Sequence, residues 1–239
     1  MLIDTHYWTP VDSAAQLVET TQDLPSAVAS VVMQAAGPFA EGRDGTFLCH
    51  NHCVFGGIDL VDGLGQVAGF LEENPSEVVT LIIQDAISVE DTEAAVTASG
   101  LAPHLYVHRP DRPWPTLREM IESGERLVVF AEEAGPPPDW YANAFESMQE
   151  TPFLALTPES LSCRPSRGDP DATLFLMNHW VQRIAPDRAD SSVINQREFL
   201  VDRARECEAE RGLAPNFLAV NFYSIGDVMG AVDELNGVG

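Results

Sequence analysis

Short apolar runs alternate along the chain with segments of helical period. Four runs carry almost no polar residue and lie at 78–83, 126–131, 174–177 and 217–220. Runs of this length without polar alternation are typical of strands buried on both faces of a parallel sheet. Shorter runs at 2–3, 46–48 and 105–107 predict further strands, and the count is seven or eight depending on whether 153–156 is one as well.

Between these runs, apolar residues recur at helical spacing and predict helices over 60–71, 117–123, 193–207 and 228–235. Asn74-Pro75 ends the first helix, and Thr116 with Glu119 forms a capping box that starts the second. Alternating strands and helices predict an α/β fold, either a (β/α) barrel or a doubly wound sheet, in a single domain over 1–239. No Gly-x-Gly-x-x-Gly follows the first strand, so we expect no dinucleotide site.

Polar side chains gather where the predicted strands end, which is where a barrel enzyme carries its chemistry. They are Asp4, His6, His50, Gln84, Asp85, Glu132, Glu133, Asn178, His179, Asn221 and Tyr223. The strand ends therefore predict the position of an active site.

His50 stands in the segment Leu-Cys-His-Asn-His-Cys at 48–53. Its Cys and His residues alternate too tightly for one tetrahedral metal ion, because neighbouring side chains on a strand point to opposite faces. One interpretation makes His50 a general acid or base at a strand end. The other is a disulfide between Cys49 and Cys53 that closes a loop and leaves the histidines merely exposed.

Asp4 and His6 are two residues apart on one predicted strand, so their side chains share a face. Such a pair can act as an acid and a base or bind a divalent ion, and the alternative is a surface ion pair.

Asn178, His179 and Trp180 follow a buried run and can line a sugar or polyol pocket. The alternative is that His179 is satisfied by backbone groups at the strand end, with Trp180 in the core. Tyr223, after Asn221, either contacts a ligand or caps the barrel.

Composition excludes several classes of function. The chain has 37 acidic residues and 13 basic residues, which give a formal net charge of −24. Every one of the 13 basic residues is arginine. A field of this sign repels nucleic acid and does not hold a protein on an anionic membrane. Without lysine there is no Schiff-base, pyridoxal or P-loop chemistry. No apolar run reaches the roughly 18 residues of a membrane span, and no signal peptide is visible.

The four cysteines, at 49, 53, 163 and 207, permit three pairings if they are oxidised. Cys207 falls on the apolar face of a predicted helix, where a free buried cysteine is common. The spacing lacks a second pair of the kind that zinc sites use.

In order, the motifs resemble the phosphatidylinositol-specific phospholipase C superfamily, in particular its bacterial X-domain-like phosphodiesterases. The matching stretches are 2–8, 47–50, 70–81, 114–121, 126–130, 178–180 and 216–236, of which the Phe-Leu-x-x-Asn-Pro-x-Glu-Val-Val of 70–79 is the most specific. The resemblance implies a distorted TIM barrel and an internal phosphoryl transfer. The inositol 2-hydroxyl attacks phosphorus, diacylglycerol leaves, one histidine is the general base and another the general acid, and an arginine or Ca²⁺ offsets the charge.

Carried over to this chain, the resemblance makes His50 the general acid. Asp4 matches a metal ligand of the calcium-using members, and Gln84 falls near another. His6 falls where metal-independent members have an arginine, and Asn221 near the acid that orients the first histidine. The residues expected to contact substrate are Glu132, His179, Trp180 and Tyr223.

The family's first histidine lies in a Thr-His-Asn or Thr-His-Asp motif that has no counterpart here, so we expect a barrel that lacks its first βα unit. Secretion and oxidised cysteines are usual in the family, which predicts an extracytoplasmic monomer. The expected partner is an inositol phospholipid headgroup. The alternatives are a catalytically impaired barrel that binds a polyol headgroup and a phosphodiesterase that acts on glycerophosphodiesters.

Overall fold

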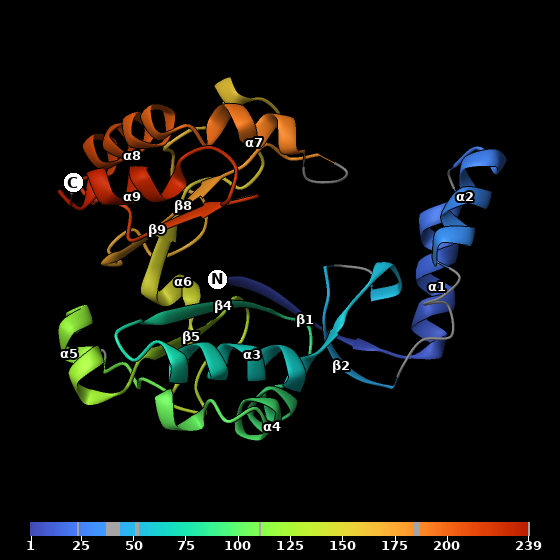
Figure 1. Cartoon of the computed structure of the whole chain (residues 1–239), viewed down its shortest axis with the longest axis horizontal. Helices are drawn as coiled ribbons and strands as arrows, with labels where there is room; N and C mark the ends of the chain where they lie inside the picture. The colour runs from blue at the N-terminus through green and yellow to red at the C-terminus, as the bar shows by residue number, and fades with distance from the viewer. Residues whose placement is uncertain (23, 37–43, 51–52, 110, 184–186, 239) are drawn as a thin grey trace. The chain divides into compact units, whose positions relative to one another are not determined.

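The computed structural model describes residues 1–22, 24–36, 44–50, 53–109, 111–183 and 187–238. The chain divides into two compact units, Met1–Asn143 and Ala144–Gly239, each with its own sheet and helices (Figure 1). Both units combine parallel strands with helices, so the predicted α/β class is confirmed.

Within its described residues, the first unit contains a six-stranded sheet of order β3-β2-β1-β4-β5-β6. The strands are β1 (Leu2–Trp8), β2 (Gly45–Leu48), β3 (Ile58–Asp59), β4 (Val79–Asp85), β5 (Leu127–Ala131) and β6 (Tyr141–Asn143). From β1 through β4 and β5 to β6 the strands are parallel. β2 instead pairs antiparallel with β1 and with β3, so the expectation of a purely parallel sheet is wrong at this edge.

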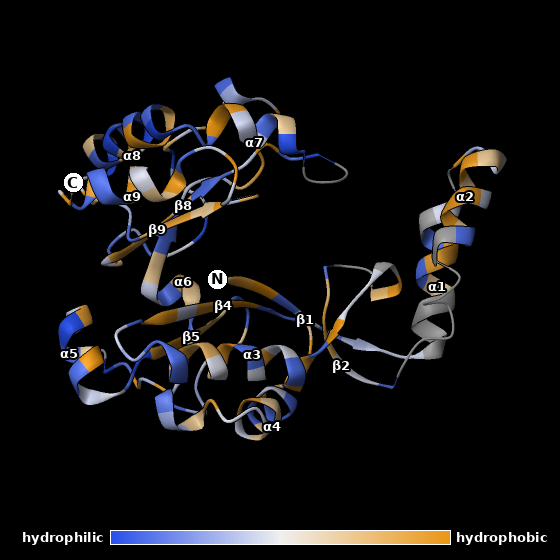
Figure 2. Ribbon diagram, viewed as in Figure 1, coloured by the Kyte–Doolittle hydropathy of each residue, from blue (hydrophilic) through white to orange (hydrophobic). Residues whose placement is uncertain are grey.

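Two helices, α3 (Leu60–Glu73) and α4 (Val89–Ala98), cover one face of this sheet (Figure 1). Leu64 and Leu71 of α3 pack with Leu81 of β4 and Val129 of β5, and all four side chains are buried. α3 follows the predicted stripe and ends before Pro75, as expected from the missing amide hydrogen of proline. Figure 2 shows β4 and β5 as largely hydrophobic strands.

The chain between β1 and β2 forms α1 (Pro10–Thr21) and α2 (Ser26–Ala36), which the apolar runs did not predict. α2 contains no charged residue, and Val31 and Met33 on it are exposed. A further helix of this unit is α5 (Leu117–Ser123), which begins with the predicted capping box of Thr116 and Glu119. Short 3₁₀ turns lie at Cys53–Phe55 and Ala102–His104.

Arg126, directly before β5, ties the end of α3 to the sheet. Its guanidinium is buried and donates to the carbonyl oxygens of Leu71 (2.8 Å), Asn74 (3.0 Å) and Glu77 (3.0 Å). These carbonyls belong to the last turn of α3 and the turn after it, where backbone acceptors have no helical partner. The arginine therefore fixes the connection that leads into β4.

In the second unit, the described residues form a three-stranded parallel sheet of order β7-β8-β9. Its elements are α6 (Ala144–Ser147), β7 (Met148–Glu150), a 3₁₀ turn (Pro158–Ser160), β8 (Leu174–His179), α7 (Arg188–Ile194), α8 (Arg197–Arg211), β9 (Phe217–Val220) and α9 (Val228–Leu235). Phe175 and Met177 of β8 are buried against Leu200 and Ala204 of α8. A disulfide joins Cys163 to Cys207 in this core, so the expectation of a free cysteine at 207 is wrong.

Several predicted elements differ in detail. Leu105 forms only an isolated bridge with Leu127, and 153–156 is not a strand. The stripe predicted over 193–207 is two helices, and Val193 is exposed because it lies on α7 rather than on the buried face of α8. A closed barrel over the whole chain stays a prediction.

We predict that Arg126→Met lowers the free energy of unfolding by about 3 kcal/mol, because three backbone carbonyl groups lose their donor inside the fold. Urea denaturation followed by circular dichroism measures the loss. The matched control is Arg118→Met on the exposed surface of α5, which we expect to change stability by less than about 0.5 kcal/mol. Equal effects of the two substitutions would contradict the role given to Arg126.

Candidate functional site

In the first unit, a row of polar side chains crosses three neighbouring strands where β4 and β5 end. Asp4 of β1 pairs in register with Gln84 of β4. Glu132 follows β5 directly, and its amide donates to the carbonyl oxygen of Ile83 at 2.9 Å. Adjacent strands lie about 4.8 Å apart, so Asp4, Gln84 and Glu132 stand side by side on one edge. The structure thus brings together three of the predicted site residues.

His50 joins this group from the turn that follows β2, two residues after the strand ends. Its Nδ1 contacts the Oδ2 of Asp4, which is 19% exposed, whereas the His50 side chain is 80% exposed. A carboxylate accepts hydrogen bonds only, so Asp4 holds the tautomer in which Nδ1 carries the proton. Nε2 is then the nitrogen available for proton transfer. The sequence predicted a role for each residue, but not that the two form a pair.

The loop that begins with His50 is closed by a disulfide between Cys49 and Cys53. The disulfide of the second alternative is therefore present, but His50 is not merely exposed, since it contacts a carboxylate; a catalytic role for His50 stays a prediction. The sulfur atoms are buried with Trp8 and Phe47, whose rings meet edge to face at 5.2 Å. His52, the second histidine of the motif, lies outside the described residues.

His6 lies two residues beyond Asp4 on β1 and is half-buried. Alternate residues of a strand share a face, so His6 projects on the same side as Asp4. β4 ends opposite Thr5, so from His6 onward β1 pairs with β2 alone. The site therefore spans the end of the parallel strands, at Asp4, and the antiparallel pair of β1 and β2, at His6.

Asp85 has a role that the sequence did not assign. Its two carboxylate oxygens accept hydrogen bonds from the amides of Glu133 (3.0 Å) and Ala134 (2.8 Å). These contacts fix the turn after β5 and with it the position of Glu132. The signal in the sequence is an aspartate next to Gln84 at a strand end, where carboxylates commonly cap backbone amides.

The second unit holds His179, Trp180, Asn221 and Tyr223 around the ends of β8 and β9. His179 is fully buried, and its Nε2 donates to the carbonyl oxygen of Ile194 at 3.0 Å. Its Nδ1 accepts from Nη1 of Arg203 at 2.9 Å. Both ring nitrogens are therefore occupied by protein groups, which fits the interpretation of a core histidine better than a substrate contact.

Burial lowers the pKa of His179 to about 4, and the neighbouring guanidinium of Arg203 adds to the shift. Burial also lowers the pKa of Arg203, to about 10, so this side chain stays charged at neutral pH. Arg203 further donates to the carbonyl oxygens of Asn178 (2.9 Å) and Ser162 (3.0 Å). Its signal in the sequence is an arginine on the otherwise apolar stripe of α8, between Leu200 and Cys207.

Around Trp180 the chain is more open. Trp180 is half-buried, and Tyr223 is 72% exposed. The carbonyl oxygen of Asn221 accepts a hydrogen bond from Nδ2 of Asn195 at 2.8 Å.

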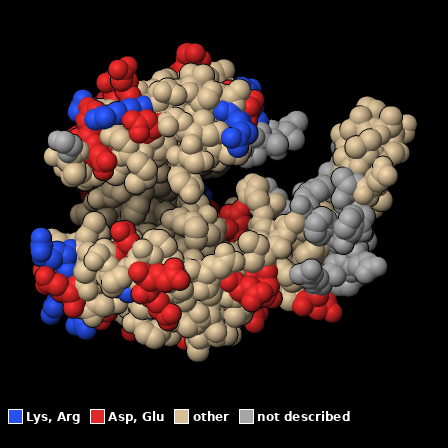
Figure 3. Space-filling view, in the orientation of Figure 1, with Lys and Arg blue, Asp and Glu red and all other residues tan. Residues whose placement is uncertain are grey.

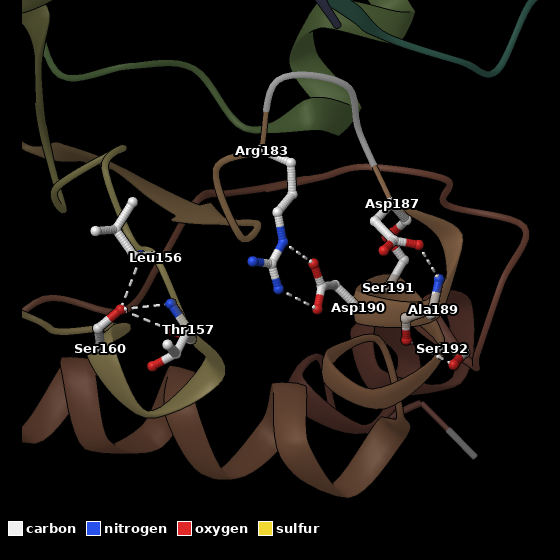
Figure 4. A network of polar contacts seen from close by, with 9 residues as sticks. All are labelled: Leu156, Thr157, Ser160, Arg183, Asp187, Ala189, Asp190, Ser191 and Ser192. Carbon is white, nitrogen blue, oxygen red and sulfur yellow. Dashed lines mark hydrogen bonds and ion pairs between the residues drawn. The ribbon is translucent and has the colours of Figure 1, made fainter.

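Arg183 forms a two-fold ion pair with Asp190 of α7, at 2.7 and 3.0 Å, which lowers the pKa of that carboxyl group (Figure 4).

A second buried network was missed by the sequence analysis. Glu150, at the end of β7, is fully buried and accepts two hydrogen bonds from Arg167, at 2.7 and 3.2 Å. Nδ2 of Asn178 donates to the same carboxylate at 2.9 Å and to the carbonyl oxygen of Thr151 at 2.7 Å. Because the side-chain amide of Asn178 is hydrogen-bonded to Glu150 and Thr151, Asn178 stabilises the core of this unit.

The residues described here fit a calcium site poorly. Calcium takes six to eight oxygen ligands, whereas in the described part of the chain no three His, Cys, Asp or Glu side chains gather as a metal site requires. Asp4 contacts His50, and Asp85 is engaged by two amides. Calcium at Asp4 and Gln84 stays a prediction of the resemblance.

A family model described as PI-PLC X 1 matches residues 6–236 of this chain. The chain belongs to the PI-PLC X family. That family implies a TIM-barrel-like fold, whereas the described residues show two separate sheets, each with parallel strands. No solved structure matches the chain. None of the helices in the described ranges is long and apolar enough to cross a bilayer.

Curated relatives of this PI-PLC X chain come from a fungus and a plant. The PI-PLC X domain-containing protein 1 of Arthroderma benhamiae is 28% identical, over 84% of this chain and 73% of its own length. An uncharacterized secreted protein of the same fungus is 30% identical, over 79% of this chain and 49% of its own length. A PI-PLC X domain-containing protein of Arabidopsis thaliana is 29% identical, over 79% of this chain and 47% of its own length.

This chain therefore spans about half the length of two of these relatives. The relatives are eukaryotic, and they support neither the bacterial branch nor the absence of a first βα unit.

We predict that His179 makes the stability of this PI-PLC X chain fall with acid. Its pKa is about 4 in the fold against an ordinary value of 6.5. Between these pH values the unfolded chain binds more protons, so the free energy of unfolding falls as the pH is lowered. The loss approaches about 3 kcal/mol at pH 4. Urea denaturation at pH 4 to 7 measures it. His179→Gln, which does not titrate, is expected to show a shallower pH dependence, and equal slopes would refute the assignment.

Proposed function

We propose that this PI-PLC X chain is a phosphoric diester hydrolase of the phosphatidylinositol phospholipase C type, with His50 as the general acid. The observation that carries the proposal is the pair of Asp4 with His50 at the exposed end of β2. A carboxylate that holds one imidazole nitrogen and leaves the other facing solvent is the arrangement that acid–base catalysis uses.

In this mechanism the 2-hydroxyl oxygen of the inositol ring attacks phosphorus and the bond from phosphorus to the diacylglycerol oxygen breaks. Nε2 of protonated His50 gives its proton to the leaving oxygen, while Asp4 keeps the Nδ1 proton in place. His6, on the same face of β1, is our candidate for the base that takes the proton of the attacking hydroxyl. The product is a cyclic inositol phosphate, and water can open it in a second step.

The substrate contacts form the second part of the proposal. Glu132 and Gln84 stand beside Asp4 on neighbouring strands, and their side chains are suited to hydrogen bonds with the hydroxyl groups of a polyol. Trp180 and Tyr223 stay predicted substrate contacts that the resemblance implies, and Asn221 stays the predicted match to the acid that orients the first histidine. The side chain of His179 is not proposed to touch substrate, because its nitrogens are occupied.

A glycerophosphodiester is the second candidate substrate, and the acidic surface favours it. Asp and Glu side chains are spread over the visible face in Figure 3, and the formal charge is −24. A surface of this sign is repelled by an anionic bilayer but less by a single soluble phosphodiester. The comparison of both substrates is therefore part of the test.

We propose an extracytoplasmic location for this chain. Two disulfides, Cys49–Cys53 and Cys163–Cys207, are stable in oxidising compartments and rare in the cytosol. The name of one relative, a secreted protein, also supports the proposal.

We predict that His50→Ala lowers the rate of phosphatidylinositol cleavage by about 10²–10⁴-fold, the usual contribution of a general acid, and that Asp4→Asn causes a smaller loss. Release of inositol phosphate from mixed micelles measures the rate, and glycerophosphoinositol is assayed in parallel. The control is His104→Ala in the 3₁₀ turn Ala102–His104, which is expected to keep wild-type activity.

Two results would count against the proposal. If the wild-type chain cleaves neither phosphodiester, the proposed activity is wrong. If cleavage occurs but His50→Ala and His104→Ala are equally active, the activity stands and the role of His50 is wrong.

A further inference from the structure

His50 is an exposed side chain with little packing to hold it. Its side chain is 80% exposed, and it contacts the carboxylate of Asp4. A single ion pair at the surface is worth little, with a median below about 1 kcal/mol. The position of the imidazole therefore depends on the backbone that carries it.

That backbone is anchored immediately before His50. The amide of Cys49 donates to the carbonyl oxygen of Asp4 at 3.2 Å, which continues the pairing of β1 with β2 by one residue. The side chain of Cys49 turns away from solvent into a small buried cluster with Trp8, Phe47 and Cys53. In this cluster Cys49 is 8% and Cys53 0% exposed.

The far end of the loop is anchored as well. Cys53 begins a 3₁₀ turn, its carbonyl oxygen accepts from the amide of Gly56 at 2.9 Å, and Val54 beside it is fully buried. The disulfide thus joins the end of β2 to a second fixed point four residues later. Without the bond, the turn after β2 regains the conformational freedom that a covalent closure removes.

We propose that the Cys49–Cys53 disulfide is a positioning element of the site, which holds the backbone of His50 so that Nδ1 meets Asp4 and Nε2 faces the substrate. The catalytic consequence rests on the proposed function, whereas the positioning of the ring does not. Proton transfer is sensitive to misplacement of the acid by about 1 Å, so loss of the bond is expected to slow the chemical step.

The disulfide is separate from the main core of its unit. The cluster of Trp8, Phe47 and the two cysteines does not belong to the core that α3, α4, β4 and β5 share. Removal of the bond is therefore expected to leave the sheet folded. This separation makes a positioning role distinguishable from a purely structural one.

The test compares Cys49→Ala/Cys53→Ala with the matched control Cys163→Ala/Cys207→Ala, which removes the disulfide of the second unit. In the first variant we expect kcat for phosphatidylinositol in mixed micelles to fall about 10- to 100-fold, with KM within a factor of about three and an altered basic limb of the pH profile. The control is expected to melt at a lower temperature but to keep kcat and the pH profile at temperatures where it is folded.

A second measurement does not depend on activity. The ring ¹⁵N shifts of His50, assigned with His50→Gln, report whether Nδ1 carries a hydrogen-bonded proton. We expect this signature in the wild-type chain and in the control, and we expect Cys49→Ala/Cys53→Ala to shift toward a freely exchanging imidazole. If circular dichroism shows that this double variant is unfolded, Cys53→Val, which refills the buried space, takes its place.

The outcomes separate the two proposals. Unchanged ring shifts and unchanged kcat in the folded Cys49→Ala/Cys53→Ala variant would overturn the positioning role. A wild-type chain that cleaves no phosphodiester but shows disulfide-dependent ring shifts would refute the proposed function and leave the positioning role supported.

Discussion

The register of β1 is the constraint on which the rest of the first unit depends. β1 pairs antiparallel with β2 and parallel with β4, so it sets the positions of His50 and Gln84 relative to Asp4. A shift by one residue would turn Asp4 to the opposite face, toward α3 and α4. Thr5 resists such a shift, because it is fully buried and its hydroxyl donates to the carbonyl oxygen of Gln84 at 3.2 Å.

Much of the fold was predictable from local patterns. The apolar runs located β4, β5, β8 and β9 within one or two residues, because buried parallel strands carry long uninterrupted hydrophobic stretches. The direction of β2 was not predictable, since strand polarity depends on pairing between distant segments. The short strands β6 and β7 carry too few residues for a periodic signal, and neither was expected.

The site was predictable as a set of residues but not as a set of contacts. Polar residues at strand ends pointed to Asp4, His50, Gln84 and Glu132, and the register brings them to one edge. The same rule also selected His179, which serves the core instead. The two histidines differ in their contact partners, which are Asp4 for His50 and Arg203 for His179. Both partners are far away in the sequence, so no local pattern predicts these contacts.

The pairing of Trp8 with Gly45 means that the chain leaves β1 and returns to β2 at the same point. The segment between these two residues, which includes α1 and α2, is therefore a loop whose ends are held together by the pairing of β1 with β2. Lengthening such a loop costs little, because its closure entropy grows only with the logarithm of its length. This part of the chain can therefore be lengthened at small entropic cost, but Leu17 and Gln16 of α1 are constrained, because Leu17 is buried with Val54 and the side-chain oxygen of Gln16 accepts from the amide of Val54 at 3.3 Å.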